Sequence, residues 1–281
     1  KRGNGTTERR KVACGVIPSK PQYSRPSDPL TAGPPTASPS FHPSVFPSYR
    51  PSSARPIFSP VNCQRVALVG DAHLGRGSPE AESAFLAFLD IVPALGDGLV
   101  ITGDLFEFWF SYSRVVPRRG ARVVAALAHL RRTVPVLLVG GNHDRWAGSF
   151  WHDELGIAFA PGEARFELGG RPALVVHGDG ITETHGSAGV LHRLLRHPAT
   201  VALYGAIHPD VGLWLVDRLS GYLGDRNRPP AEVDGSATRQ HAWASGRLDL
   251  EPSLALLVMG HTHRTAVVPT PSGQLYVNPG A

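Results

Sequence analysis

The chain has 281 residues, of which 42% are hydrophobic and 18% charged, and its formal net charge is +5. Its length suits one large domain or two small ones and is enough to bury a substantial core. Two cysteines are too few for a disulfide scaffold and favour a reducing compartment, and no apolar run reaches the roughly 18–20 residues of a membrane span.

The first 60 residues differ from the rest in composition. They hold nine Lys/Arg, two Asp/Glu and 12 of the 26 prolines, whereas the remaining residues hold 19 basic and 21 acidic side chains. We therefore expect residues 1–62 to form a disordered, basic, Pro/Ser-rich tail, because they offer too little apolar surface to offset the entropy of ordering. A linker, an extension upstream of the true start and a transit peptide all fit this composition. The excess basic charge belongs to the tail, so it does not indicate that the folded part binds nucleic acid.

Beyond the tail, apolar runs typical of buried strands alternate with helical periodicities. In chain order we predict a strand at 66–70, a helix at 79–95, a strand at 99–103, a helix at 118–132, strands at 134–139 and 173–176, a mostly helical stretch at 183–250, a strand at 254–258 and a hairpin over 267–277. This alternation predicts an α/β domain over residues 63–281, with ligand chemistry at the carboxyl ends of its strands.

Polar residues follow five of the predicted strands. The motifs are Asp71-Ala72-His73, Gly103-Asp104, Gly141-Asn142-His143-Asp144, His177-Gly178-Asp179 and Gly260-His261-Thr262-His263. Each motif alone is typical of a turn or of a structural histidine. Together they predict one site, because an open α/β sheet brings the carboxyl ends of its strands to a single crevice.

The types of side chain in these motifs indicate the chemistry. Carboxylate, amide and imidazole groups without a thiolate suit Mn²⁺, Fe²⁺, Mg²⁺ or Zn²⁺. Seven candidate ligands exceed the needs of one ion, so we predict two divalent ions, with Mn²⁺ preferred. A pair of ions can acidify a shared water and screen the charge of a phosphoryl group, so the sequence predicts metal-assisted hydrolysis of phosphoesters.

The order of these motifs is similar to that of the calcineurin-like metallophosphoesterase superfamily, over residues 66–281. The resemblance implies a four-layer α/β/β/α sandwich with a two-metal centre at its upper edge. It also implies seven metal ligands: Asp71, His73, Asp104 and His263 for one ion, and the bridging Asp104 with Asn142, His177 and His261 for the other. His143 would face the leaving group as the catalytic proton donor or charge stabiliser, with Asp144 orienting its ring. For Asp179 we expect a turn or a supporting role.

Within the superfamily, the stretch from Gly103 to Trp109 resembles UDP-2,3-diacylglucosamine diphosphatases, which cleave a pyrophosphate bond in lipid A synthesis. The helical insertion over 183–250 resembles the cap that holds acyl chains in those enzymes, although its apolar residues also suit an ordinary core. Many of those enzymes carry Arg at the position of His143, so the chain resembles a divergent branch. Candidate substrate-binding residues are Glu107, Trp109, Arg193 and Arg196; the alternatives are a packing role for Glu107 and Trp109 and a solvated face for the two arginines.

The resemblance implies in-line attack of a hydroxide shared by the two ions on a phosphorylated small molecule or a lipid-linked substrate. It also implies a cytoplasmic location, with the cap in peripheral contact with the inner membrane. Alternatives are an enzyme of this fold that acts on soluble nucleotides, phosphoproteins or nucleic acid, and a non-catalytic scaffold. Nucleic acid is the less expected partner, because the folded part lacks a basic excess. The superfamily usually continues for at least one more strand, so we expect a truncated carboxyl end.

Overall fold

The structure is a computed structural model that describes residues 62–75, 79–181, 194–223 and 230–281. The predicted tail lies outside these ranges apart from its last residue, as do the start of the predicted insertion and Arg193. Among the described helices, none combines the length and the apolar character that crossing a bilayer requires.

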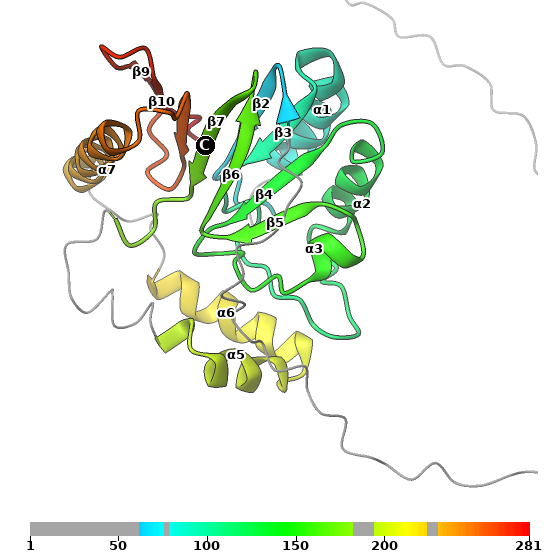
Figure 1. Ribbon diagram of the computed structural model, residues 1–281. Helices are drawn as coiled ribbons and strands as arrows, with labels where there is room; N and C mark the ends of the chain where they lie inside the picture. The colour runs from blue at the N-terminus through cyan, green and yellow to red at the C-terminus, as the bar shows by residue number, and fades with distance from the viewer. Residues whose placement is uncertain (1–61, 76–78, 182–193, 224–229) are drawn as a thin grey trace, which may run out of the picture. The chain divides into compact units, whose positions relative to one another are not determined.

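One sheet is entirely parallel and has four strands in sequence order (Figure 1). They are β2 (Val66–Val69), β3 (Gly98–Ile101), β4 (Val136–Gly140) and β5 (Ala158–Pro161). Every residue of β3 and β4 is buried, as expected for parallel strands that are covered on both faces. The parallel arrangement brings the carboxyl ends of β2, β3 and β4 to the same edge.

The other sheet has six strands in the order β1-β6-β7-β8-β10-β9. They are β1 (Asn62–Cys63), β6 (Glu163–Leu168), β7 (Arg171–Val176), β8 (Leu256–Met259), β10 (Leu275–Asn278) and β9 (Ala266–Pro269). β6 and β7 form an antiparallel hairpin, whereas β7 and β8 are parallel, with Val176 paired to Met259. The carboxyl ends of β7 and β8 therefore lie side by side.

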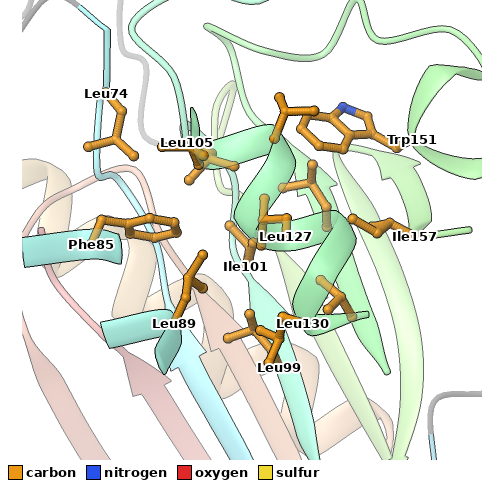
Figure 2. Close-up of a cluster of buried hydrophobic side chains, with 14 of the residues drawn as sticks. Leu74, Phe85, Leu89, Leu99, Ile101, Leu105, Leu127, Leu130, Trp151 and Ile157 are labelled. Atoms are coloured by element: carbon orange, nitrogen blue, oxygen red, sulfur yellow. The ribbon is translucent and has the colours of Figure 1, made fainter. Parts of the chain in front are cut away.

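Helices cover the outer face of the parallel sheet. α1 (Pro79–Leu95) and α2 (Ala121–Leu130) bury apolar side chains at helical spacing, and the short α3 (Phe150–Asp153) buries Trp151. Figure 2 shows these side chains around β3, where Leu99 and Ile101 meet Phe85 and Leu89 of α1 and Leu127 of α2. The predicted helices at 79–95 and 118–132 are confirmed. The second begins slightly later than predicted, at Ala121, and ends slightly earlier, at Leu130.

The two sheets pack face to face through alternate residues of their strands. Val100 and Val139 of the parallel sheet share one buried cluster with Val175 and Val258 of the six-stranded sheet. The intervening residues point the other way: Leu257 packs against α7 (Pro230–Leu250) on the outer face of its sheet. The layers are helix, sheet, sheet and helix, so the predicted α/β/β/α sandwich is confirmed.

Four described elements were absent from the sequence-based prediction, namely β1, α3, β5 and β6. The predicted helical stretch at 183–250 contains three helices in its described part: α5 (Pro198–Gly205), α6 (Pro209–Leu223) and α7. α7 is part of the sandwich, whereas α5 and α6 contact the loop after β3. Tyr204 of α5 packs on Phe110 at a ring-centroid distance of 4.7 Å, and Asp217 of α6 pairs with Arg119 at 2.8 Å.

Candidate metal centre

The five predicted motifs lie at the carboxyl ends of five strands. Asp71 and His73 follow β2, Asp104 follows β3, Asn142 to Asp144 follow β4, His177 and Asp179 follow β7, and His261 and His263 follow β8. Three of these strands belong to the parallel sheet and two to the other sheet, yet their loops hydrogen-bond to one another. The backbone N–H of His261 donates to the carboxylate of Asp71 at 2.8 and 3.0 Å, across 190 residues of sequence.

The backbone is strained where these side chains begin. Among the described residues other than glycine, positive φ angles occur at Asp71, His73, Asp104, His261 and His263, with values of 50°, 45°, 49°, 71° and 55°. Each such conformation costs on the order of 1–3 kcal/mol and persists only where surrounding contacts enforce it. Here the N–H groups of Asp71 and His73 donate to the carbonyls of Gly103 and Asp104, both at 3.0 Å. The loops are therefore held in conformations that serve side-chain placement.

Four side chains form a first cluster on the side of β2. The Nε2 atoms of His73 and His263 lie 3.2 Å apart. His263 Nε2 is 3.7 Å from Asp71 Oδ1, and His73 Nε2 is 3.8 Å from Asp104 Oδ2. Two imidazole nitrogens that face each other at this distance need a shared proton or a shared cation between them.

A second cluster, deeper in the structure, also contains Asp104. The Nε2 atom of the fully buried His177 lies 3.2 Å from both Asp104 Oδ2 and Asn142 Oδ1. Asn142 Oδ1 is in turn 3.1 Å from Nδ1 of His261. The opposite ring nitrogen of His177, Nδ1, donates to the carbonyl of Thr102 at 2.9 Å, which orients Nε2 toward the cluster.

Both clusters fit divalent metal ions. Neighbouring ligands of an octahedral ion at about 2.1 Å stand about 3.0 Å apart, close to the 3.1–3.2 Å separations in the second cluster. Asp71, His73 and His263, and likewise Asp104, His177 and His261, each bring one ligand atom within 4.8 Å of the others. Oxygen and imidazole ligands suit the hard and borderline ions that hydrolytic enzymes use.

The electrostatics of the two clusters also favour cations. Burial raises the pKa of Asp71 to about 6, and the neighbouring charge of Asp104 adds to the effect. Burial alone would lower the pKa of His177, but the charge and hydrogen bond of Asp104 outweigh it and raise that pKa to about 10. The buried carboxylates of Asp71 and Asp104 thus lie close together, and a nearby positive charge stabilises both. That charge can be a proton on His177 or a metal ion.

A sequence profile of the calcineurin-like phosphoesterase family matches residues 64–265. The chain belongs to this family. UDP-2,3-diacylglucosamine hydrolase of Porphyromonas gingivalis is 27% identical over 220 residues, which cover 71% of this chain and 83% of that protein. The protein of the same name from Stutzerimonas stutzeri is 28% identical over 212 residues, covering 72% and 82%. Among solved structures, the phosphoesterase Yfce from E. coli matches with a TM-score of 0.37 and 15% identity, over 77% of this chain and 79% of that one.

Family membership shows that this calcineurin-like phosphoesterase is a hydrolase and that its substrate is a phosphoester. The two clusters are consistent with the binuclear metal site of the family.

His143 lies at the rim of the first cluster. Its Nδ1 atom donates to the backbone carbonyl of Glu107 at 2.7 Å, and its ring stands edge-on to that of His73, with 4.8 Å between centroids. The prediction that Asp144 orients this ring is wrong. Both carboxylate oxygens of Asp144 accept backbone N–H groups instead, from Gly141 at 2.8 Å and from Leu105 at 2.7 Å. Asp144 therefore ties the loop after β4 to the loop after β3.

The predicted substrate-binding residues have different outcomes. Trp109 is 1% exposed and stacks on Phe106 in the helix-covered core, which favours a packing role over a substrate contact. Glu107 is beside the first cluster, with Oε2 3.4 Å from Nδ1 of His73. Arg196 donates to the carboxylate of Asp179, two residues after His177. Arg193 lies outside the described residues.

Gly141 leaves no room for a side chain. A Cβ atom there would overlap Asp104 Oδ1 and lie 2.7 Å from Nε2 of His177. We expect Gly141→Ala to displace both side chains, to lower the metal content of the second cluster and to reduce turnover by about 10²-fold or more. Metal analysis after dialysis and steady-state kinetics test this. Gly246→Ala is the matched control, since a Cβ on that α7 glycine meets nothing within 4 Å. Full metal content and turnover in Gly141→Ala would show that the close approach is unimportant.

The sequence analysis missed a buried polar network behind the loop after β8. The carboxamide of Gln240 in α7 donates to the carbonyl of Gly260 at 2.7 Å and accepts from Thr262 Oγ1 at 2.8 Å. Asn278 donates to the same carbonyl at 3.2 Å. A Cβ on Gly178 would lie 2.6 Å from Gln240 Nε2. This carboxamide therefore contacts both the loop that carries His177 and the loop that carries His261 and His263. A lone Gln in a helix gives no sequence signal for such a role.

We expect Gln240→Leu to weaken Mn²⁺ binding by about 10- to 100-fold, because groups that orient ligands tune affinity by this amount. Leu also leaves the Gly260 carbonyl and the Thr262 hydroxyl without their Gln240 partner. Competition with a fluorescent chelator measures the affinity. Thr238→Ala, on the exposed side of the same helix, is the control. An unchanged affinity in Gln240→Leu would remove Gln240 from the support of the centre.

Proposed function

We propose that this phosphoesterase uses two divalent cations, most suitably Mn²⁺, to cleave the pyrophosphate bond of a lipid-linked nucleotide of the UDP-2,3-diacylglucosamine type. The observation that carries the proposal is the convergence of both clusters on one buried carboxylate, Asp104. The two relatives described above, whose names state hydrolysis of UDP-2,3-diacylglucosamine, support the substrate class.

In this proposal Asp71, His73, Asp104 and His263 hold one ion, and Asp104, Asn142, His177 and His261 hold the other. The bound ions would supply an acidified water and neutralise the charge of the phosphoryl oxygens. The protein contributes placement: Asp104 serves both clusters, and its Oδ1 accepts the backbone N–H of His143 at 2.9 Å. This contact fixes the loop of His143 relative to the shared carboxylate.

His143 acts on the leaving group. Because its Nδ1–H is directed to the Glu107 carbonyl, Nε2 is the nitrogen available to a substrate oxygen. Protonated at Nε2, the ring gives a proton to the departing phosphate or stabilises its charge. Asp144 supports this step only through the backbone, by joining the loops after β3 and β4.

A narrow cleft adjoins the first cluster at Glu107. Its walls come from the segments around Leu74 and Phe106 to Phe108 and from Leu213 and Val216 of α6. Glu107 lines the cleft and contacts His73, so the cleft opens toward the metal ligands. We restrict the proposed cap to α5 and α6, and we propose that this cleft receives an acyl chain or the sugar that bears it.

The same two helices expose large apolar side chains, among them Leu203 at 70% and Trp214 at 62%. Such a surface suits peripheral contact with a bilayer that holds a lipid-linked substrate, which would place the enzyme on the cytoplasmic side of the inner membrane. Co-sedimentation with phosphatidylglycerol vesicles, compared between the full chain and its Trp214→Ser variant, tests this contact. Equal sedimentation of both proteins would contradict it.

The decisive experiment is a hydrolysis panel on the full chain with and without Mn²⁺. It compares UDP-2,3-diacylglucosamine with UDP-N-acetylglucosamine, bis-p-nitrophenyl phosphate and single-stranded DNA. We expect the largest kcat/KM for the acylated nucleotide and loss of all activities after chelation. Equal rates on all phosphodiesters, or a preference for a substrate without acyl chains, would replace the lipid precursor by a soluble phosphoester.

A further inference from the structure

Two arginines share one buried carboxylate next to the metal clusters. Nη1 of Arg145 donates to Asp179 Oδ2 at 3.1 Å, and Nη2 of Arg196 donates to the same oxygen. The side chain of Asp179 is 4% exposed, that of Arg145 is 13% exposed and that of Arg196 is 39% exposed. The group therefore pairs one buried carboxylate with two guanidinium groups, of which that of Arg145 is largely buried and that of Arg196 is exposed.

This group belongs to the loops that carry the second cluster. Asp179 follows His177 by two residues, and Arg145 follows Asn142 by three residues. The charges of Asp104 and Asp144 act on Arg145, and those of His177 and His261 act on Asp179, so the ionic group adjoins the centre. Arg196 lies in the segment before α5. The preceding residue, Leu195, accepts a hydrogen bond at its carbonyl from Nε1 of Trp146, the residue after Arg145, at 3.3 Å.

One guanidinium is enough to neutralise a carboxylate, and Arg196 adds a second positive charge on the exposed side of the pair. Burial lowers the pKa of Arg145, and the charge of Arg196 acts in the same direction against the effect of Asp179. Each guanidinium has five N–H donors, yet within the described residues Asp179 is the acceptor recorded for either one. The remaining N–H donors on the exposed side are available to an anion, and the planar fork of arginine matches a phosphate.

We propose that Arg145 and Arg196, positioned by Asp179, form a phosphate subsite that binds the second phosphoryl group of a diphosphate substrate while the first lies at the metal centre. This inference rests on the proposed two-metal centre but not on the acyl chains or on the sugar. It assigns the pair a role in selecting diphosphate diesters over simple phosphodiesters. Arg145 had no signal in the sequence, because nothing there showed that it would reach Asp179.

The test compares inhibitors that differ by one phosphate. Inhibition of bis-p-nitrophenyl phosphate hydrolysis by UDP and by UMP is to be measured in the full chain and in Arg196→Gln. We choose Arg196 because Arg145 still neutralises Asp179 in this variant. We expect the inhibition constant of UDP to rise about 10-fold or more, the loss typical of one charge-assisted hydrogen bond, and that of UMP to rise far less. Arg145→Lys, which keeps the charge but loses the fork, should show the same selectivity.

Arg218→Gln is the matched control, because it removes one exposed positive charge from α6 outside this group. Equal effects of Arg196→Gln on UDP and UMP, or an effect on UDP no larger than that of Arg218→Gln, would overturn the subsite. If UDP-2,3-diacylglucosamine proves not to be a substrate, the comparison of UDP with UMP still decides the matter. Failure of the lipid proposal and failure of the subsite are therefore distinguishable.

Discussion

Replacing Asp104 by alanine should reduce turnover to background, a loss of at least about 10³-fold, together with loss of bound metal. Asp104 contributes to both clusters, with Oδ2 3.2 Å from His177 Nε2 and 3.8 Å from His73 Nε2. No other described side chain has this double contact. Removing it takes one ligand from each proposed ion and abolishes the negative charge that both share.

The Asp104→Asn variant removes the negative charge of this side chain but keeps its shape. The amide keeps an oxygen that can accept the His143 backbone N–H, so the loop should stay in place. The charge of Asp104 raises the pKa of the fully buried His177, and the surrounding histidines lower the pKa of Asp104 in turn, so the substitution removes a favourable buried ion pair. We therefore expect the metal-free Asn variant to unfold at a lower temperature than the metal-free parent, and its metal content and activity to fall. Inductively coupled plasma mass spectrometry and calorimetry measure the two effects. Two bound ions with parental turnover in either variant would refute the role.

The sequence predicted the site better than it predicted the elements around it. Short apolar runs identified β2, β3, β4, β7 and β8, and the residue types after each run were chemically unusual enough to be recognised. Their convergence followed from a rule about parallel strands, which holds for β2, β3 and β4 in one sheet and for β7 and β8 in the other. The rule does not reveal that the two sets belong to different sheets.

Roles that depend on tertiary contacts could not be predicted from the sequence. Asp144 follows a histidine and was expected to orient its ring, but its carboxylate accepts the N–H groups of Gly141 and Leu105. Trp109 follows a predicted ligand closely, yet the chain turns it into the core against Phe106 and Trp151. Spacing along the chain cannot separate these outcomes, because the direction of a side chain in a loop is set by backbone angles that the sequence does not display.

The helical stretch before β8 illustrates the same limit. Its helices were predicted as one insertion, but α7 covers the six-stranded sheet through Ala244 and Leu248. From the face toward the loop after β8, the same helix contributes Gln240 to the polar network. The periodicity of a helix predicts that it has an apolar face but not which surface that face packs against. The structure was therefore needed to assign α7 to the sandwich and α5 and α6 to the cap.

His143→Ala should slow hydrolysis by about 10²- to 10⁴-fold while both ions stay bound. The ring hydrogen-bonds through Nδ1 to the Glu107 carbonyl and presents Nε2 to the site, as a proton donor to the leaving group requires. The geometry also offers a competing role, because ligand atoms of His73, Asp104 and His143 lie within 4.8 Å of one another. Metal content separates the two roles: two ions per chain in the variant support proton donation, and one missing ion makes His143 a ligand.

The leaving group provides a second and independent measurement for His143. A proton donor matters most when the departing oxygen is a poor leaving group, so the loss in His143→Ala should be larger for diphenyl phosphate than for bis-p-nitrophenyl phosphate. A metal ligand would instead affect both substrates alike, because the same step on the same ions would be impaired. Equal losses together with a missing ion would move His143 from the leaving group to the metal centre and would leave the departing phosphate without an assigned acid.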